Sequence, residues 1–325
     1  MSIVKIVGVG HYCPENAVSN DQLSTLVDTS HEWIVKRTGI SERRISKGEG
    51  TVDLAVKAAI NAMDMARCTP EDIDLIIVAT TSPDRIMPST ACSVQSILGC
   101  NNAAAFDITA ACSGFLYATI IANSLMKNGE GSKALVIGSE VLSRIVDWND
   151  RNTCVLFGDG AGAAILEIST DNSRIISTYF GSDGNKGAKA LTANQFPIET
   201  PFADTSLKRE EYIQMDGREV FKFAISIIPK VVNKLLENSN EDISNIKYII
   251  PHQANLRIID DAAKKLNISK DKFYVNLESY GNTSAASVPI AFSEAINKGL
   301  LNKGDKVILV AFGGGLTWAG ILLEL

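Results

Sequence analysis

This sequence has few histidines and no closely spaced pair of cysteines. Only three histidines occur among 325 residues, and the six cysteines form no Cys-x-x-Cys pair. This spacing excludes the common zinc frameworks and a disulfide scaffold. We therefore expect no metal site, and a protein that is kept reduced in the cytoplasm.

Long apolar runs and an excess of positive charge are also missing. The longest apolar runs, such as 75–79, fall far short of the roughly 20 residues that span a membrane. The first residues, MSIVKIVGVGHYCPE, alternate like a strand and lack the pattern of a signal peptide. The 31 basic and 37 acidic residues give a net charge of −6. We expect neither a membrane protein nor a nucleic-acid-binding protein.

The sequence does contain an internal duplication. A succession of strands and helices over residues 71–140 recurs over 243–315 at a nearly constant offset of 172 or 173 residues. Repeats in register indicate two similar supersecondary units. We predict two α/β halves, 1–170 and 171–325.

Each half combines short apolar strands with one helix that is apolar or small on nearly every side, beginning near residues 112 and 283. Such strands belong to sheets that are covered on both faces, and such helices are buried. We therefore predict a layered α/β architecture with the two helices between two sheets. In the second half the prediction includes a strand at 272–277, equivalent to the strand at 103–108.

Three residues with reactive side chains lie at the ends of these elements. Cys112 begins the first buried helix, Asn282 precedes the second, and His252 follows the strand that repeats 74–79. Pseudo-symmetry, with Ser284 as the counterpart of Cys112, brings the three loop ends together. A thiolate at a helix N-terminus is an activated nucleophile for an acyl group. His and Asn hydrogen-bond donors then stabilise an enolate, and backbone N–H groups of Cys112 and of 313–315 form an oxyanion hole.

Simpler interpretations remain open for each residue taken alone. A lone cysteine is usually a buried small hydrophobe, and Asn282 is suited to cap a helix. A Cys-His-Asn set also occurs in papain-like proteases, although the sequence motif around such a nucleophile is missing here. A non-catalytic scaffold is the third alternative. Convergence on one structural frame favours a carbon–carbon condensing enzyme.

Two glycine-rich motifs resemble dinucleotide loops. GDGAG (158–162) is followed by an apolar strand, and GVG (8–10) lacks the third glycine at the required spacing. Both fail the strand–turn–helix context of a Rossmann fingerprint. We predict that both motifs form tight turns.

Six segments together resemble one family across essentially the whole chain. They are DTSHEWIVKRTGISERR (28–44), DITAACSGF (107–115), FGDGAGA (157–163), PHQANLRI (251–258), YGNTSAAS (280–287) and AFGGGLTW (311–318). The chain resembles the β-ketoacyl-acyl-carrier-protein synthase III family, the initiating condensing enzymes of type II fatty acid synthesis in the thiolase-like superfamily. The resemblance implies a thiolase-like αβαβα fold, a homodimer and no metal or redox cofactor.

The resemblance also implies roles for individual residues. Cys112 is the acyl-accepting nucleophile, His252 and Asn282 are the decarboxylation pair, Phe312 lies beside the thiol, and Gly314 is the oxyanion glycine. Thr29, Trp33, Arg37 and Arg151 match positions that hold coenzyme A. An indole and a guanidinium suit an adenine ring and phosphates, whereas a core tryptophan and a solvated arginine are the simpler alternatives.

The implied partners are an acyl-coenzyme A and a malonyl-acyl carrier protein. Lys222, Arg257, Lys264 and Lys265 are expected to dock the acidic carrier protein, although Asp260 and Asp261 on the same helix dilute the charge. Residues 86–88 are expected to shape the primer pocket. The alternative function within this fold is a specialised ketosynthase-III-like enzyme of secondary metabolism with another primer or extender.

Overall fold

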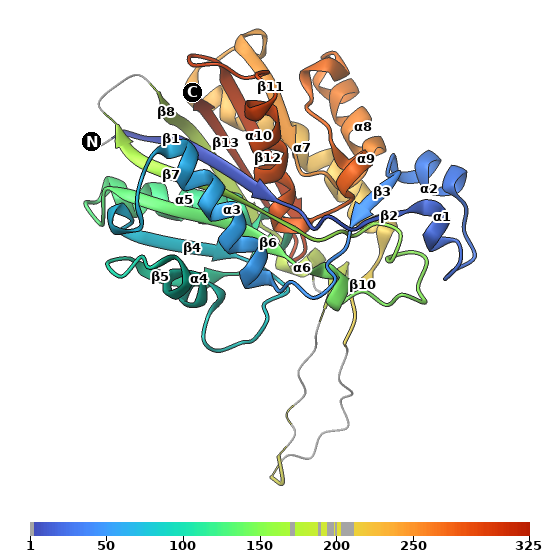
Figure 1. Ribbon diagram of the computed structural model, residues 1–325. Coiled ribbons are helices and arrows are strands. Elements are labelled where there is room, and N and C mark those ends of the chain that lie inside the picture. The colour runs from blue at the N-terminus through green and yellow to red at the C-terminus, as the bar shows by residue number, and fades with distance from the viewer. Residues whose placement is uncertain (1–2, 170–172, 188–189, 194–197, 199, 203–210) are drawn as a thin grey trace.

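The computed structural model describes residues 3–169, 173–187, 190–193, 198, 200–202 and 211–325 (Figure 1). The boundary that we predict between the halves, at 170/171, lies outside the described residues. None of the described helices is both long enough and apolar enough to pass through a bilayer.

The first sheet contains five strands in the order β1-β7-β6-β4-β5. They are β1 (Ile3–Tyr12), β7 (Gly160–Ser169), β6 (Lys133–Glu140), β4 (Leu75–Ala79) and β5 (Ala104–Ile108). Strand β4 runs parallel to β5 and β6, while β1, β7 and β6 are antiparallel. Every residue of β4 is buried, which explains its uninterrupted apolar sequence.

The second sheet repeats this order with one strand fewer. Its strands are β8 (Arg174–Ser182), β13 (Thr317–Glu324), β12 (Lys306–Gly313) and β11 (Ile246–Pro251), in the order β8-β13-β12-β11. Neighbours have the same parallel and antiparallel senses as β1-β7-β6-β4. The shared order supports the duplication that the sequence predicts.

Our prediction of a strand at 272–277 is wrong. Only one bridge forms there, between Ile249 and Phe273, and the single turn η5 (Lys270–Lys272) and the short helix α9 (Leu277–Tyr280) flank it. The side chain of Gln253 supplies the missing ladder partners, because its amide donates to Tyr274 O at 3.2 Å and accepts from Asn276 N at 3.1 Å. A side chain thus replaces the neighbouring backbone.

Helices fill the space between the sheets and cover their outer faces (Figure 1). The central pair is α5 (Gly114–Lys127) and α10 (Ser287–Asn297), each preceded by a single turn, η2 (Ala111–Ser113) and η6 (Ser284–Ala286). The outer helices are α3 (Thr51–Ala66), α4 (Thr90–Leu98), α7 (Gly217–Ser239) and α8 (Leu256–Leu266). One hydrophobic cluster joins the two sheets to the central helices, and two more lie between each sheet and its outer helices. This arrangement confirms the predicted layered architecture.

The remaining elements are short. They are β2 (Ala17–Ser19), α1 (Asn20–Leu23), α2 (His31–Thr38), β3 (Glu42–Arg44), η1 (Pro70–Asp72), η3 (Leu142–Arg144), α6 (Gly184–Gly187), β9 (Leu191–Thr192), β10 (Gln214–Met215) and η4 (Ile243–Asn245). Helix α2 is capped by Ser30 and ends at Gly39 in the left-handed region.

The glycine motifs are not the tight turns that we predict. Residues 8–10 lie inside β1, and residues 160–162 open β7. A Cβ atom on Gly10 would collide with the backbone of α3, and one on Gly162 would lie 2.7 Å from Ile290 N in α10. These glycines let helices pack directly on the strands.

Candidate active site

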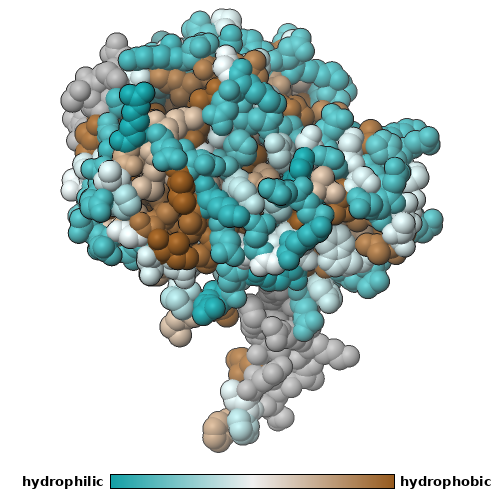
Figure 2. Space-filling model, in the orientation of Figure 1, coloured by the Kyte–Doolittle hydropathy of each residue, from teal (hydrophilic) through white to brown (hydrophobic). Residues whose placement is uncertain are grey.

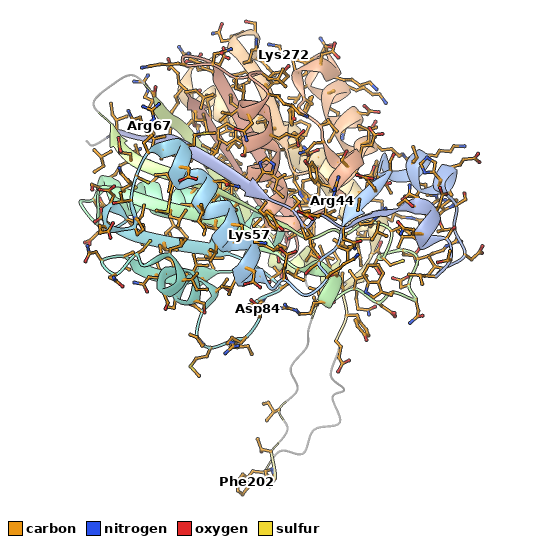
Figure 3. The ribbon with its side chains drawn as sticks, in the orientation of Figure 1. Arg44, Lys57, Arg67, Asp84, Phe202 and Lys272 are labelled. Carbon is orange, nitrogen blue, oxygen red and sulfur yellow. The ribbon has the colours of Figure 1, made fainter. Side chains whose placement is uncertain are left out.

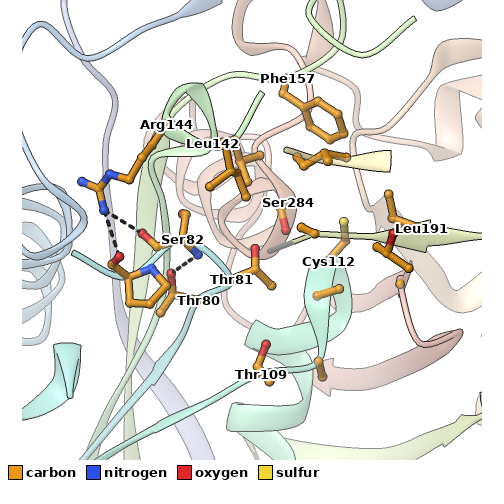
Figure 4. A pocket seen from close by; sticks show the side chains of 18 of the residues that line it. Thr80, Thr81, Ser82, Thr109, Cys112, Leu142, Arg144, Phe157, Leu191 and Ser284 are labelled. Carbon is orange, nitrogen blue, oxygen red and sulfur yellow. Dashed lines mark hydrogen bonds between the residues drawn. The ribbon is translucent and has the colours of Figure 1, made fainter. Parts of the chain in front are cut away.

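One cavity of about 830 Å³ opens where the first sheet meets the central helices (Figure 4). Its lining includes the loop after β4 (80–86), the turn that carries Cys112, Phe157, Ser284 and Gly314. Strand ends and helix starts of both halves therefore contribute to one space.

The loop after β4 is anchored to the first turn of α3 and to Arg144. Asp84, labelled in Figure 3, accepts hydrogen bonds from Thr51 N at 3.0 Å and Val52 N at 2.9 Å in the first turn of α3. Its carboxylate also pairs with Arg144 at 2.6 Å. These contacts fix the loop beside the nucleophile candidate.

Cys112 lies in η2, at the start of the buried helix α5, as the sequence predicts. The preceding residue, Ala111, has φ of +48°, in the left-handed region that costs a non-glycine residue about 1–2 kcal/mol. A Cβ atom on Gly313 would lie 2.6 Å from Cys112 N, so only glycine permits this close approach. The turn is strained and packs tightly against Gly313, and it places Cys112 in the wall of the cavity.

Burial, rather than the helix terminus, dominates the ionisation of Cys112. Burial raises the pKa of the thiol to about 12, whereas a hydrogen bond with the Ser284 side chain acts in the opposite direction. We expected the helix N-terminus to lower the thiol pKa, so the structure corrects the sign of the net shift. Because the thiolate is the nucleophilic form, burial opposes its formation and the hydrogen bond with Ser284 favours it.

His252 lies directly after β11, where its backbone N–H donates to Val310 O at 2.8 Å. The ring is buried, which lowers the pKa of His252 to about 3 and keeps it neutral. Its Nδ1 lies 2.6 Å from Ser287 Oγ, which also accepts from Gln253 N at 3.5 Å. Because the Ser287 hydroxyl hydrogen is left for Nδ1, this arrangement favours a hydrogen on Nε2.

Phe312 packs edge-on against His252, with 5.2 Å between ring centroids. Phe312 is at the end of β12, directly before Gly313, which contacts Cys112. The β12 terminus therefore links the histidine segment to the cysteine turn.

Asn282 precedes η6 and is held by backbone hydrogen bonds to the segment of Phe157. Asn282 N donates to Leu156 O at 2.8 Å, and Gly158 N donates to Asn282 O at 3.0 Å. Its side-chain Oδ1 accepts from Ser284 N at 2.9 Å, which closes an Asx turn ahead of η6, whose N-cap is Thr283. The capping role considered for Asn282 is therefore wrong, and its NH₂ group remains the donor end.

A second cavity, of about 1070 Å³, is lined by two of the four residues expected to hold coenzyme A, whereas Thr29 and Arg151 do not line it. Trp33 and Arg37 line it, and the guanidinium carbons of Arg37 and Arg151 lie 4.7 and 5.0 Å from Trp33 ring centroids. Thr29 Oγ1 is buried without a hydrogen-bond partner in the described structure. Trp33 is half-buried rather than part of the core, which makes a core role the weaker alternative.

The four basic residues expected to dock a carrier protein fall on α7 and α8. Lys222 and Arg257 line the second cavity, whereas Lys264 and Lys265 lie further along α8. Their charges are partly satisfied within the chain, as Lys222 pairs with Glu219 at 2.7 Å and Lys264 with Asp261 at 3.1 Å. The other aspartate on this helix, Asp260, pairs with Lys270 at 2.9 Å.

Of the residues expected to shape the primer pocket, only Ile86 lines the cavity around Cys112. Met87 is 84% exposed, and Pro88 lines a separate shallow cavity. Both lie outside the cavity wall of the single chain.

Sequence reasoning missed three polar residues of this region, namely Ser284, Ser287 and Glu140. The repeat in the sequence predicts that Ser284 is the counterpart of Cys112, and this pairing is wrong. The turns η2 and η6 align at an offset of 173, so Ala285 is the counterpart of Cys112 and Ser284 that of Ala111. Glu140 could have been found from the sequence, because it is an acidic residue at the end of an otherwise apolar strand.

The chain matches two family models. The 3-oxoacyl-[acyl-carrier-protein] synthase III model matches residues 106–184, and the model of the C-terminal region of the same family matches residues 236–325. The two matches contain Cys112, His252 and Asn282.

Full-length relatives agree. The chain is 54% identical to the β-ketoacyl-[acyl-carrier-protein] synthase III of Clostridium botulinum (strain Hall) over 323 residues, 99% of each chain. It is also similar to the solved structure of 3-oxoacyl-[acyl-carrier-protein] synthase III from Aquifex aeolicus, with TM-score 0.92, 48% identity and coverage of 99% and 100%. The corresponding enzyme structure from Thermus thermophilus gives TM-score 0.92 at 41% identity, with 99% of both chains covered.

These similarities exclude the hydrolase and scaffold alternatives. The chain belongs to the β-ketoacyl-acyl-carrier-protein synthase III family and is a condensing acyltransferase with the thiolase-like fold.

Proposed function

We propose that the chain joins an acyl-coenzyme A primer to a malonyl-acyl carrier protein by decarboxylative Claisen condensation, the first condensation of type II fatty acid synthesis. The observation that carries this proposal is the cavity that Cys112 and Gly314 both line. His252 and Asn282 do not line that cavity themselves, but His252 packs against Phe312 next to Gly313, and Asn282 bridges to Phe157, which lines the cavity. Acyl thioesters are the substrates, and the proposed reaction uses no metal or redox cofactor.

The first half-reaction moves the acyl group onto Cys112. Trp33, Arg37, Arg151 and Thr29 hold the coenzyme A end, since the indole face and guanidinium groups suit an adenine ring and phosphates. The Cys112 thiol gives up its proton, its sulfur bonds to the thioester carbonyl carbon, and backbone N–H groups of Cys112 and Gly314 stabilise the oxyanion. The bond between that carbon and the coenzyme A sulfur then breaks, and the expelled coenzyme A thiolate takes up a proton. The acyl chain occupies the cavity beside Ile86 and Phe157.

The second half-reaction creates the carbon nucleophile. Loss of CO₂ from the malonyl thioester leaves an enolate, whose oxygen accepts hydrogen bonds from His252 Nε2–H and the Asn282 NH₂ group. A neutral histidine suits this role, because an uncharged ring can still donate a hydrogen bond from Nε2–H to the enolate oxygen. The enolate carbon then attacks the Cys112 thioester and expels the sulfur.

The proposal includes a cytoplasmic homodimer that receives the carrier protein at Lys222, Arg257, Lys264 and Lys265. The surface in Figure 2 is mostly hydrophilic, with apolar residues exposed on the side of α3. Among large apolar side chains, Ile86 and Met87 are 79% and 84% exposed beside the primer cavity. Exposed apolar side chains of this size favour burial against a partner.

The direct test is the site of acylation. Incubation with acyl-coenzyme A thioesters of graded length should add one acyl mass to the peptide that contains Cys112, and Cys112→Ala should abolish it. Cys92→Ala is the matched control, because Cys92 is the exposed thiol. An acyl group on Cys92, Cys100 or Cys154 would refute the mechanism.

A second assay separates the specialised alternative. The acylated enzyme is given malonyl-acyl carrier protein or malonyl-coenzyme A, and the β-keto product is measured. Product from the carrier protein supports fatty acid initiation. Product from malonyl-coenzyme A alone would assign the chain to a specialised pathway.

A further inference from the structure

Arg43, in β3, is a buried charged residue to which the proposed mechanism gives no role. Its side chain is among the largest that are fully buried in the described structure. Burial lowers the pKa of Arg43 to about 10, which still leaves the guanidinium charged at neutral pH. Among the described residues no carboxylate pairs with it, and the adjacent Glu42 pairs with Arg44 at 2.8 Å instead. The buried charge therefore depends on hydrogen bonds to neutral groups.

The guanidinium of Arg43 joins two backbone segments that are far apart in the sequence. Its Nη1 donates to Val18 O in β2 at 3.0 Å, and its Nη2 donates to Val155 O at 2.8 Å. The Nε atom has no hydrogen-bond partner in the described structure. The planar guanidinium holds two acceptors at fixed relative positions. Arg43 therefore ties the segment 155–158 to the β2–β3 hairpin.

The same segment, 155–158, holds the backbone of Asn282. Asn282 N donates to Leu156 O at 2.8 Å, and Gly158 N donates to Asn282 O at 3.0 Å. These two bonds pair Phe157 with Asn282 as in a parallel ladder. The carbonyl that accepts from the guanidinium thus belongs to the residue next to the one that accepts from Asn282. A displacement of this segment would carry Asn282 with it.

The aliphatic part of Arg43 packs against both members of this pair. Figure 1 shows β3 beside α9, the short helix that precedes Asn282. A Cβ atom added to Gly158 or to Gly281 would lie 3.2 Å from Arg43 Cβ. The one on Gly158 would also lie 2.3 Å from Tyr280 O. Such close contacts transmit a change at Arg43 directly to the backbone on either side of Asn282.

We propose that Arg43 is a positioning residue for Asn282 in the decarboxylation step. Its two hydrogen bonds fix the segment 155–158, and that segment fixes the backbone that carries the Asn282 NH₂ donor. Residues of the segment also line both the cavity around Cys112 and the second cavity, so its position bears on the substrates directly. The inference rests on the role of Asn282 in the proposed function.

The experiment is a double-mutant cycle between Arg43 and Asn282. Each protein is first acylated at Cys112, and condensation with saturating malonyl-acyl carrier protein is then measured as β-keto product, with Cys112→Ala as the background of the assay. Arg43→Met removes both donors and should slow condensation about 100-fold, since a displacement of about 1 Å can cost this much. In Asn282→Ala it should add less than about a twofold loss, because the group that it positions is already missing. Acylation of Cys112 should change less than condensation.

Arg43→Lys is the conservative variant. It keeps the charge, but a single ammonium group cannot hold both carbonyls as the guanidinium does. Condensation should fall about tenfold, the effect of losing one charged hydrogen bond. The same cycle can be run with Arg43→Lys if Arg43→Met does not fold. Met126→Ala is the control for destabilisation alone, because Met126 is buried at the end of α5 away from Cys112.

Amide hydrogen exchange provides a measurement that needs no substrate. In Arg43→Met the N–H groups of Asn282 and Gly158 should exchange about tenfold faster, because their mutual hydrogen bonds open more easily. Met126→Ala should not single out these two amides. An equal loss of condensation from Arg43→Met in both backgrounds, or no loss in the wild-type background, would overturn the inference. Wild-type condensation in Asn282→Ala would be a failure of the proposed function itself.

Discussion

The two strand-to-helix junctions of this molecule have the same backbone but different chemistry. The turns η2 and η6 begin with residues at φ +48° and +47°, Ala111 and Ser284, and each leads into a central helix. In the first half the next residue is Cys112, whereas in the second half it is Ala285. The two turns thus provide equivalent backbone positions, and only the first of them carries a nucleophilic side chain.

The connections between strands differ in the same way. In the first half, β6 and β7 are separated by residues 141–159, which include Arg144 and Arg151. In the second half, β12 and β13 are joined by only Gly314–Leu316, which returns the chain next to Cys112. The first half thus has a long connection between these strands, and the second half has a tight glycine turn.

Moving the thiol to the other junction should give the largest effect. In the Cys112→Ala/Ala285→Cys double variant we expect at least a ~10⁴-fold loss of condensation. Ala285 is 1% exposed and is not part of the cavity wall, so the relocated thiol should not reach the substrate. Intact mass after incubation with acyl-coenzyme A measures acyl transfer. Substantial acylation of the relocated thiol would show that the junctions are interchangeable.

The second largest effect should come from the proposed oxyanion donors of the second half, His252 and Asn282. His252→Ala and Asn282→Ala are each expected to slow condensation about 100- to 1000-fold while Cys112 still acylates, because removal of one donor typically costs this much. Release of CO₂ and the acyl mass separate the two half-reactions. His31→Ala is the control, since His31 is exposed.

Asn282→Asp sharpens this test. It keeps the oxygen that accepts from Ser284 N but removes the NH₂ donor. Loss of condensation with retained stability would separate catalysis from the Asx turn. Wild-type condensation in this variant would leave Asn282 with the Asx turn alone.

The residues proposed to bind coenzyme A, on α2 and in the β6–β7 connection of the first half, should show a smaller effect. Arg37→Ala and Arg151→Ala should raise the KM for acyl-coenzyme A about ten- to a hundredfold, since a charged hydrogen bond is worth roughly 1.5–3 kcal/mol. The KM for malonyl-acyl carrier protein should change less. Lys36→Ala, an exposed neighbour on α2, should leave both values unchanged. An unaltered KM in both arginine variants would move the coenzyme A site elsewhere.

Acid should destabilise the chain through His252. The folded-state pKa of about 3 lies below the ordinary value of 6.5, so the unfolded state binds more protons between these values. Stability should fall as pH drops below 6.5, by about 2 kcal/mol from this residue at pH 5. Urea unfolding at pH 7.5 and 5 should show a weaker pH dependence in His252→Gln than in the wild type. His31→Gln should behave like the wild type.

The smallest effect concerns carrier docking. Arg257→Glu/Lys264→Glu should raise the KM for malonyl-acyl carrier protein about three- to tenfold at low salt and leave Cys112 acylation intact. The effect is modest because Lys264 is already paired with Asp261. Added salt should weaken it through screening. Lys234→Glu, a reversal elsewhere on α7, is the control. Equal KM values would place docking on another surface.

The sequence alone determined the elements and the order in which they alternate. Apolar strands such as β4 and the all-round apolar helices α5 and α10 follow from local pattern, because the period and burial of side chains are written along the chain. The repeat also predicts the strand ends that carry Cys112, His252 and Asn282.

The tertiary structure decided what depends on contacts between distant segments. Gln253 replaces a strand at 272–277, Gly10 serves packing rather than a turn, and burial overrides the helix terminus at Cys112. The hydrogen bonds between Ser82 and Glu140 likewise join residues that are 58 positions apart. Desolvation and hydrogen bonding depend on which groups surround a side chain in space, and that information exists only after the two halves have packed together.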